Sequence, residues 1–389
     1  MTVVFYTNFI NHHQVPLADE FYKILGDDYK MVTFEPLPES FQLKGYADFS
    51  YKPYLIEAFR SEDNMKKAHQ LSIHSDVVIL GAAPECFIQE RLKLNKVTFR
   101  YGERLFKKID RRILKISYWK NLYCEHTRYR KKPLYMLAAN GYMKSDVSKL
   151  FAYPNKVFKW GYFTNASQID IHEVLRKKRD IQQIRILWCG SICQVKRPDL
   201  IVKLGYLLKK DNIDFRIDMV GEDSGWTNQI KDLIQELNVS DCVFMLGSFP
   251  NEQLLKMMEE YHIFAFTSDR GEGWGVVLNE AMGCGCSVVS SNRIGAAPFL
   301  IKNKENGLLF ESGSIKSLYQ QIKALIDDCE LREKLAIQAY HTISEEWGPR
   351  KAAENFIQLA SGILSNSISL IMDGPCSKAT MINHKKIIR

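Results

Sequence analysis

Short apolar runs alternate along the chain with segments whose apolar residues recur at helical spacing. Runs such as 2–9 and 75–82 are short and rich in β-branched residues, as buried strands are. Segments such as 16–26 and 198–210 have the periodicity of amphipathic helices. Because strands and helices alternate at these distances, the pattern predicts βαβ units and therefore parallel sheets.

The alternation stops and then restarts near the middle of the chain. Residues 169–183 are polar, have no apolar pattern of their own, and are expected to form a linker. A new alternation of strands and helices begins at residue 184. A chain of 389 residues also exceeds one ordinary core. We therefore predict an α/β protein with two Rossmann-like, doubly wound parallel-sheet domains, at 1–168 and 184–345, and a weakly patterned tail at 365–389.

Composition excludes several classes of protein. The chain is 46% hydrophobic and 25% charged, which is globular rather than disordered. No apolar run approaches the roughly 20 residues of a membrane span, and the N-terminus does not resemble a signal peptide. Nine cysteines, an odd number, favour a reducing compartment over a disulfide framework. A cytoplasmic location is therefore expected.

The positive charge is concentrated in one segment. Residues 100–132 carry 12 Lys and Arg against three acids, which accounts for the whole net charge of +8. Apolar residues recur in it at roughly helical spacing, at Leu105, Phe106, Ile109, Ile113, Leu114, Ile116 and Trp119. Two interpretations stay open, a solvated helix face or a basic amphipathic helix on an anionic membrane, peripheral to the inner face of the cytoplasmic membrane. Nucleic acid is not expected as a partner.

Three glycine turns of the second half follow predicted strands. Gly190 and Gly221 each follow an apolar run, and "TSDRGEGWGVVLNEAMGCGCSVVSS" (267–291) follows a third. Ligands of open parallel sheets bind at the carboxyl ends of the strands, so the three turns are expected to meet. A helix starting near Gly275 would offer free backbone amides to a phosphate, and Lys196 would add a positive charge. The amides concerned belong to Val276, Val277 and Leu278.

Two carboxylates, Glu272 and Glu280, flank this predicted helix start. A carboxylate only accepts hydrogen bonds, which suits the donating hydroxyls of a sugar. A sugar on each side of a diphosphate is a nucleotide sugar, so Glu280 is predicted to hold the ribose and Glu272 the transferred sugar. The structural alternative is that Glu272 caps the helix and Glu280 lies on a solvated face.

The second half resembles the donor domain of retaining glycosyltransferases of the GT-B fold, in particular glycosyltransferase family 4 (group 1). The resemblance covers 184–345, and the signature residues are Glu272, Gly273, Trp274, Gly275, Glu280, Ala281, Met282 and Gly285. It implies two Rossmann-like domains facing a central cleft, with 346–364 crossing back to the first domain. It also implies that Glu272 contacts the donor sugar, Glu280 the ribose, and Lys196 the diphosphate.

Four positions of the donor half depart from the family pattern. Ser191 stands where arginine is common, and Arg197 stands where glycine is common and would supply the missing charge. Phe299 replaces a usual glutamate, and Trp274 replaces a common phenylalanine, either packing in the core or stacking on a ligand. The predicted donor-binding set is Gly190, Ser191, Arg197, Gly221, Gly273, Trp274, Gly275, Val276, Val277 and Glu280.

The first half resembles the acceptor domains of members that build bacterial capsular or surface polysaccharide. The loop "NFINHHQ" is expected to face the cleft, so His12 and Gln14 are predicted to bind the acceptor and His13 to transfer a proton. Together with Glu272 and Lys196, His13 completes the predicted catalytic set. Arg100, Glu103 and Arg104 in "FRYGER" either meet an acceptor diphosphate or form a local ion pair.

The resemblance implies a retaining transferase that moves a sugar from a nucleotide sugar, such as a UDP-sugar, to a glycan or lipid-linked saccharide. No Asp-x-Asp turn ends a predicted strand, so we expect no metal and no cofactor. A GT-B phosphorylase, a nucleotide-sugar epimerase and a non-catalytic nucleotide-sugar-binding protein remain as alternatives. A dinucleotide dehydrogenase is disfavoured, because no G-x-G-x-x-G opens the first strand and helix.

Overall fold

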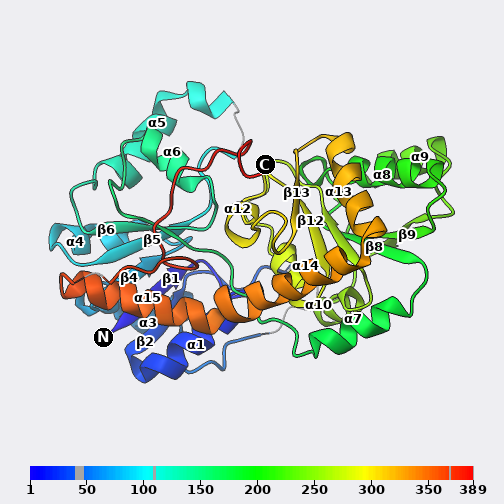
Figure 1. Ribbon diagram of the computed structural model, residues 1–389. Coiled ribbons are helices and arrows are strands. Elements are labelled where there is room, and N and C mark those ends of the chain that lie inside the picture. The colour runs from blue at the N-terminus through cyan, green and yellow to red at the C-terminus, as the bar shows by residue number, and fades with distance from the viewer. Residues whose placement is uncertain (40–47, 108–110, 368, 389) are drawn as a thin grey trace. The chain divides into compact units, whose positions relative to one another are not determined.

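Two parallel β-sheets organise the chain in the computed structural model, which describes residues 1–39, 48–107, 111–367 and 369–388 (Figure 1). The first unit comprises Met1–Thr164 and Trp347–Met381, and the second comprises Asn165–Glu346 with the C-terminal residues from Ile382. The predicted α/β class with two Rossmann-like doubly wound sheets is confirmed.

The first unit holds a seven-stranded sheet in the order β3-β2-β1-β4-β5-β6-β7, all paired in parallel. The order reverses between β1 and β4, as in Rossmann folds. The central strands β1 and β4 are buried along their whole length, which is typical of a sheet covered on both faces. The strands are β1 (Val3–Thr7), β2 (Tyr29–Thr33), β3 (Leu55–Glu57), β4 (Val77–Leu80), β5 (Thr98–Gly102), β6 (Leu134–Ala138) and β7 (Val157–Lys159).

Helices connect and cover these strands. Phe21 of α1 packs edge-on against Phe356 of α15, at 5.4 Å between ring centroids, which brings the C-terminal helix onto this sheet. The helices of the unit are α1 (Val15–Leu25), α3 (Glu62–His74), α4 (Cys86–Lys93), α5 (Ile116–Leu122), α6 (Met143–Lys149) and α15 (Pro349–Leu364), with short turns η1 (Gly26–Asp28), η2 (Ala58–Arg60), η3 (Arg111–Leu114) and η4 (Tyr123–Thr127).

A buried arginine ties the loops at the amino-terminal edge of this sheet. The Arg91 side chain is fully buried, and its guanidinium donates to four backbone carbonyls at 2.7–3.1 Å, those of Ser72, Ser75, Asp76 and Val97. Burial lowers the pKa of Arg91 to about 10, which still leaves the group charged at neutral pH. The carbonyls therefore replace the water that the cation gives up.

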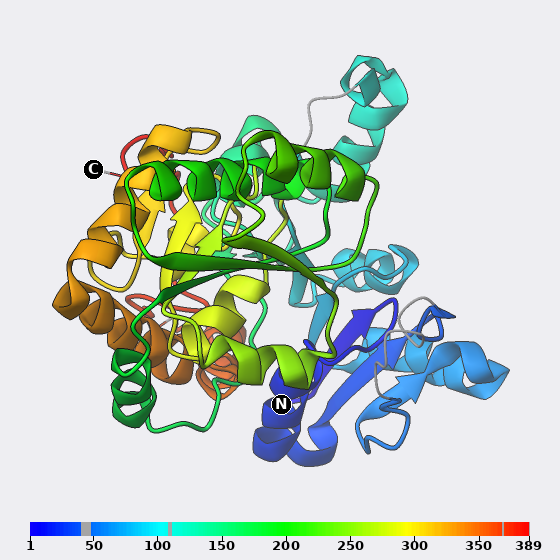
Figure 2. The same ribbon diagram turned by 90° about the vertical axis from the view of Figure 1, so that its right-hand side faces the viewer.

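The second unit holds a six-stranded parallel sheet in the order β10-β9-β8-β11-β12-β13, which reverses between β8 and β11. Helices α8, α9 and α13 lie on one face, and α10 and α11 lie on the other (Figure 2). The strands are β8 (Ile184–Cys189), β9 (Phe215–Val220), β10 (Val243–Gly247), β11 (Ile263–Phe266), β12 (Ser287–Ser291) and β13 (Leu308–Phe310). The helices are α7 (Ile171–Arg179), α8 (Pro198–Lys210), α9 (Thr227–Glu236), α10 (Asn251–Met258), α11 (Val277–Gly283), α12 (Ala297–Leu300), α13 (Ile315–Asp327) and α14 (Cys329–His341), with turns η5 (Gln194–Lys196) and η6 (Thr342–Glu346).

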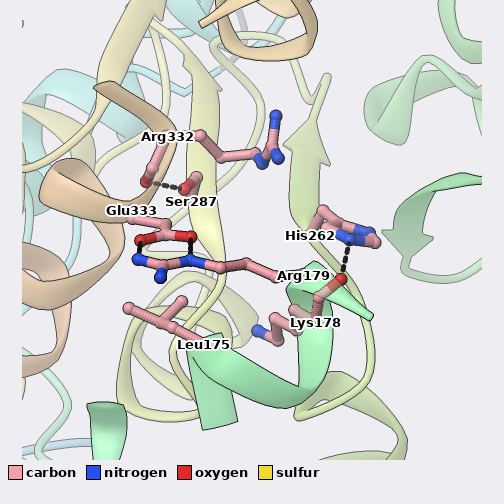
Figure 3. A pocket seen from close by; sticks show the side chains of 7 residues that line it. All are labelled: Leu175, Lys178, Arg179, His262, Ser287, Arg332 and Glu333. Atoms are coloured by element: carbon pink, nitrogen blue, oxygen red, sulfur yellow. Dashed lines mark hydrogen bonds and ion pairs between the residues drawn. The ribbon is translucent and has the colours of Figure 1, made fainter. Parts of the chain in front are cut away.

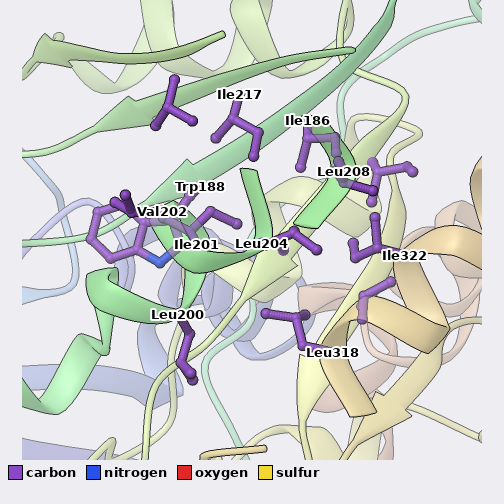
Figure 4. Close-up of a cluster of buried hydrophobic side chains, with 14 of the residues drawn as sticks. Ile186, Trp188, Leu200, Ile201, Val202, Leu204, Leu208, Ile217, Leu318 and Ile322 are labelled. Carbon is purple, nitrogen blue, oxygen red and sulfur yellow. The ribbon is translucent and has the colours of Figure 1, made fainter. Parts of the chain in front are cut away.

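The core of the second unit lies between its sheet and helices α8 and α13. Ile186 and Trp188 of β8 pack there with Leu204 of α8 and Ile322 of α13, all buried (Figure 4). The Trp188 indole donates to Thr267 Oγ1 at 2.7 Å, so its one polar atom is satisfied within the core. This packing fixes the carboxyl end of β8, where one of the predicted glycine turns begins.

The predicted linker at 169–183 is wrong, because most of it forms α7. Ile171 and Leu175, one helical turn apart, are buried against Ala336 of α14. Lys178 is buried and donates to the Gly285 carbonyl at 2.6 Å. An Arg179–Glu333 ion pair closes the small cavity around this cluster (Figure 3). A two-residue apolar stripe in a basic helix was too short to be recognised as a core pattern.

The C-terminal tail has no helix or strand among residues 369–388, yet it is anchored. The Cys376 amide donates to the Lys159 carbonyl at 2.8 Å, and Lys378 forms an isolated bridge with Phe158. Residues 382–388, which we call the strap, belong to the second unit. There the side-chain amides of Asn292 and Asn303 donate to two strap carbonyls at 2.8 Å, those of His384 and Ile388.

The segment 100–132 does not form the continuous amphipathic helix that its spacing predicts. Among the described residues it consists of the end of β5, irregular turns, η3, the short helix α5 and η4. Lys108, Ile109 and Asp110 lie outside the described residues. No helix in the described parts of the chain combines the length and apolar character that crossing a bilayer requires.

Candidate functional site

The candidate site lies at the carboxyl edge of the second sheet, where the strand order reverses between β8 and β11. Such switch points are where open α/β sheets bind ligands. The two turns that follow these strands are joined, because the Asp269 amide donates to the Val195 carbonyl at 2.9 Å and Thr267 Oγ1 donates to the Lys196 carbonyl at 2.7 Å. Chemistry-bearing side chains of both turns are therefore held at one edge.

Lys196 and Glu272 meet at this edge. Lys196 Nζ lies 2.5 Å from Glu272 Oε2, and both side chains are largely buried, at 21% and 13% exposure. The Lys196 ammonium also lies 5.8 Å from the centre of the Phe266 ring. The two residues predicted to hold the diphosphate and the transferred sugar are thus adjacent. Each serves as the other's partner in the absence of ligand.

Glu280 is buried at the same edge of the unit. Its side chain lies in α11 and accepts a hydrogen bond from Asn251 Nδ2 at 2.9 Å. Burial raises the pKa of Glu280 to about 7, although the Asn251 bond opposes the shift. The alternative of a solvated face is therefore wrong for Glu280. Nothing in the sequence marked Asn251 beyond its place at the start of a predicted helix.

Gly221 and Gly190 touch each other at the ends of their strands. A Cβ added at Gly221 would lie 1.9 Å from the Gly190 carbonyl oxygen, a distance at which no side chain fits. Gly275 has φ of +91°, and a Cβ there would meet the Phe266 ring at 2.6 Å. These glycines are required by close approach, which supports their placement in the donor turns.

Helix α11 differs from the prediction at its start. It begins at Val277 rather than near Gly275, and it has seven residues. The Leu278 amide donates to the Gly275 carbonyl at 3.0 Å, so it is not available to a phosphate. Phosphate binding by the backbone amides of Val276 and Val277 stays a prediction. Glu272 does not cap the helix, because α11 has no side-chain cap.

Trp274 occupies the core rather than the surface of the turn. It is 1% exposed, and its indole nitrogen donates to Asn279 Oδ1 at 2.9 Å. Phe299 is also buried and lies 6.3 Å from Trp274 between ring centroids. The core-packing alternative therefore describes Trp274, next to the position where this chain has lost the usual glutamate. Gly273, beside it, is buried as well.

Arg197 has a conformation that explains why glycine is common at its position. Its backbone is left-handed, with φ of 52° and ψ of 50°, at the N-cap of α8. Its guanidinium donates to both carboxylate oxygens of Asp199 at 2.8 and 2.9 Å, and Lys203 also reaches Asp199. The observed partner of Arg197 is therefore Asp199, and its role in supplying the charge missing at half-buried Ser191 stays a prediction.

In the first unit, His12 and His13 follow β1 at the corresponding switch point. Their rings lie 3.7 Å apart between centroids. Burial and the neighbouring His12 lower the pKa of His13 to about 3, so its imidazole is neutral at pH 7 and a weaker base than a free histidine; its proton-transfer role stays a prediction. Gln14 uses its side chain locally, donating to Thr7 Oγ1 at 3.2 Å and accepting from the Asn11 amide.

The three charged residues in and just after β5 form local ion pairs. Arg100 is buried, pairs with Glu85, and donates to the Glu125 carbonyl at 3.0 Å. Arg104 Nε lies 3.0 Å from the buried carboxylate of Asp146. Glu103 pairs with Lys107 and accepts from Tyr162 at 3.1 Å. The ion-pair alternative is therefore observed for all three, and contact with an acceptor stays a prediction.

Comparison with known proteins identifies the domain that carries the candidate site. The family model of glycosyl transferases group 1 matches residues 172–342, which is nearly the whole second unit. This domain belongs to the group 1 glycosyltransferases. The predicted resemblance is thereby confirmed, and the group 1 domain begins within α7, inside the stretch that was predicted to be a linker.

Curated relatives match part of the chain. A Campylobacter jejuni N-acetylgalactosamine-N,N'-diacetylbacillosaminyl-diphospho-undecaprenol 4-alpha-N-acetylgalactosaminyltransferase is 32% identical over 148 residues, which is 38% of this chain and 39% of the relative. A putative colanic acid biosynthesis glycosyltransferase, WcaL of Escherichia coli, is 30% identical over 36% of each chain. This chain therefore spans well under half the length of these two relatives.

Solved structures resemble nearly the whole chain, the group 1 domain included. Anabaena Alr3699/HepE in complex with UDP has a TM-score of 0.69 and 14% identity, covering 93% of this chain and all of that one. WaaG, a glycosyltransferase involved in lipopolysaccharide biosynthesis, has a TM-score of 0.59 and 17% identity over 90% of this chain and 98% of its own. The fold is therefore GT-B, as the resemblance implied.

Proposed function

We propose that the protein is a retaining glycosyltransferase of bacterial polysaccharide biosynthesis. It moves a sugar from a nucleotide sugar to a glycan or lipid-linked saccharide. The observation that carries the proposal is the Lys196–Glu272 pair at the switch point, in the same domain edge as the buried Glu280. A cation beside two carboxylates suits a diphosphate that links two polyhydroxylated groups.

Donor binding would exchange the partners of the ion pair. The diphosphate oxygens would take the Lys196 ammonium, which frees Glu272 to accept from hydroxyls of the transferred sugar. Glu280 would accept from the ribose hydroxyls, with Asn251 orienting its carboxylate. The close contact of Gly190 with Gly221 lets the two turns approach the ligand through backbone alone.

The chemical step in this proposal breaks the bond between the anomeric carbon and the phosphate oxygen. Lys196 stabilises the charge that develops on the leaving nucleoside diphosphate, an electrostatic effect that is strongest in a partly buried site. The acceptor hydroxyl attacks the same face, and the departing phosphate oxygen takes its proton. Retention of configuration follows from this geometry. This step leaves no proton for His13, whose lowered pKa of about 3 makes it a weak base, so its proton-transfer role stays a separate prediction.

The nature of the substrates is inferred from the relatives. HepE is described in complex with UDP, and the name of the Campylobacter protein describes a diphospho-undecaprenol-linked acceptor. We therefore propose a UDP-sugar donor, a lipid-linked saccharide acceptor in capsule or other cell-surface polysaccharide synthesis, and a cytoplasmic location at the inner membrane face. We also propose that transfer needs no metal, since the chain has no Asp-x-Asp turn.

Nucleotide release tests this proposal. The purified protein is incubated with a panel of UDP-sugars, with and without polyprenyl-diphosphate-linked saccharides, and the anomeric configuration of any product is read by proton NMR. Release that depends on the acceptor, with retention and without loss in EDTA, is expected. Release of sugar phosphate, inversion, or donor binding without turnover would each refute the assignment.

A matched pair of variants ties the activity to the site. Lys196→Ala is expected to lower kcat by about 100-fold or more, as loss of a charge-stabilising donor does. Lys203→Ala removes another lysine of the same domain, one that reaches only Asp199, and is expected to leave kcat within about twofold. Equal effects from the two variants would exclude Lys196 from the reaction.

A further inference from the structure

A short basic segment of the first unit exposes large apolar side chains in the part of the chain that the structure describes. Leu114 and Ile116 are 80% and 87% exposed, and Trp119 and Tyr123 are 45% and 56% exposed. The exposed lysines Lys115 and Lys120 lie between them in sequence. We call these six residues the α5 patch. Single exposed apolar residues are ordinary, but four within ten positions form a patch that marks an interaction site.

The helix that carries the patch packs, among the described residues, mainly against neighbouring segments of the chain. In both views the α5 segment projects from the first unit (Figures 1 and 2). Among the described residues, its sequence neighbours η3 and η4 pack most closely against it, and the Phe106 ring lies 6.2 Å from the Trp119 ring between centroids. The projection is nonetheless built, because the Trp119 indole nitrogen donates to the Ile113 carbonyl at 2.7 Å and the ring packs edge-on against Tyr118. The patch is therefore a preformed feature.

We propose that the α5 patch docks the protein on an anionic lipid bilayer. Leu114 and Ile116 would enter the acyl boundary, and Trp119 and Tyr123 would lie at headgroup level, where aromatic residues are enriched. Lys115 and Lys120 would meet anionic headgroups, each adding favourable electrostatic energy. Charge complementarity selects this partner, because a second copy of a chain with net charge +8 would bring basic segment against basic segment.

This inference deepens the proposed function. It rests on that function only to explain why the protein would bind a bilayer, since a lipid-linked acceptor resides in one. It also replaces the membrane-bound amphipathic helix, one of the two interpretations of 100–132, with a compact anchor. The anchor is short, so it predicts reversible and salt-sensitive attachment rather than stable insertion.

Vesicle sedimentation tests the proposal directly. The full chain is mixed with vesicles of 30% phosphatidylglycerol in phosphatidylcholine and with pure phosphatidylcholine vesicles. Binding is expected to be at least about tenfold tighter to the anionic vesicles and to weaken as salt rises. Leu114→Ser/Ile116→Ser and Lys115→Glu/Lys120→Glu are each expected to weaken anionic binding by about tenfold or more.

Two double variants elsewhere in the first unit serve as matched controls. Leu370→Ser/Met372→Ser removes apolar residues that are 69% and 89% exposed, and Lys66→Glu/Lys67→Glu reverses two exposed lysines of α3. Both are expected to leave vesicle binding within about twofold. Brominated lipids are expected to quench Trp119, since four of the six tryptophans are buried, and Trp119→Phe should remove most of that quenching.

The outcomes separate this inference from the proposed function. Failure of the wild-type chain to bind anionic vesicles, or equal binding by the α5 and control variants, overturns the docking proposal. The proposal is also overturned, in favour of self-association, if sedimentation of the protein alone shows a dimer and the Leu114→Ser/Ile116→Ser variant is monomeric. Sugar transfer to a water-soluble acceptor analogue, measured as UDP release, is expected to persist in all these variants. Its absence would therefore count against the proposed function alone.

Discussion

The contact between Gly190 and Gly221 provides the sharpest test of the candidate site at the carboxyl edge of the second sheet. In Gly221→Ala the new Cβ would lie 1.9 Å from the Gly190 carbonyl oxygen, whereas real Cβ contacts are essentially never shorter than 3.0 Å. The two strand ends must therefore separate by at least 1 Å. Two backbone hydrogen bonds resist that movement. The Gly190 amide donates to the Val220 carbonyl at 2.9 Å, and the Gly221 amide donates to the Gly247 carbonyl at 2.8 Å.

The cost of this separation can be estimated from known overpacking effects. Overfilling a packed site costs about 3 kcal/mol at the upper end of the usual range, so the free energy of unfolding of the second unit should fall by about that amount. The same shift displaces the turn that leads to Lys196. A misplacement of about 1 Å costs on the order of 100-fold in rate, so kcat/KM should fall by about that factor.

Urea unfolding followed by circular dichroism measures the first effect, and UDP release measures the second. Gly102→Ala is the matched control, because a Cβ there meets only Met143 Cε, at 3.8 Å. Its stability is expected to change by no more than about 0.5 kcal/mol. The reasoning fails if Gly221→Ala unfolds and turns over like Gly102→Ala.

Three further predictions follow from single side chains. The pKa of Glu280 is raised from 4.5 to about 7, so between these pH values the folded state binds a proton that the unfolded state has lost. The free energy of unfolding should therefore fall by about 3 kcal/mol as pH rises from 4.5 to 7. Glu280→Gln should flatten that slope in pH-dependent urea titrations. Arg197→Gly should be more stable than Arg197→Ala by about 1 kcal/mol in thermal melts, because only glycine adopts φ of 52° without strain, and equal stabilities would contradict the assignment. Arg91→Lys should lower the free energy of unfolding by about 3 kcal/mol, because one ammonium cannot reach four carbonyls; a loss under about 1 kcal/mol would show that water replaces them.

The sequence allowed the strands and the donor motif to be predicted because each carries a local signal. Parallel strands are continuous apolar runs, and Glu272 and Glu280 lie in a glycine-rich turn of fixed spacing. Contacts made by distant residues carry no such signal. Asn251 reaches Glu280 from 29 positions away, and Arg91 collects carbonyls from loops on either side of it in sequence.

Two errors of prediction have a common physical cause. Helix α7 was missed because Ile171 and Leu175 are its only buried apolar residues, and most of the other positions are charged. A helix face was predicted within the segment 100–132 because its apolar spacing is roughly helical, yet that spacing is interrupted by turns. Periodicity reports which residues share a face only when a helix forms, and tertiary packing decides whether it does.

The strap and the C-terminal helix have a consequence for folding during synthesis. Each unit is discontinuous in sequence, since the first needs Trp347–Met381 and the second needs the residues from Ile382. Until those residues leave the ribosome, the first sheet lacks α15, and the amides of Asn292 and Asn303 lack their strap acceptors. Domains usually fold in order as they emerge, at about 5–20 residues per second. Here both units become complete only after the residues from Trp347 onward have emerged, so a nascent chain stalled before residue 347 should remain sensitive to protease in both.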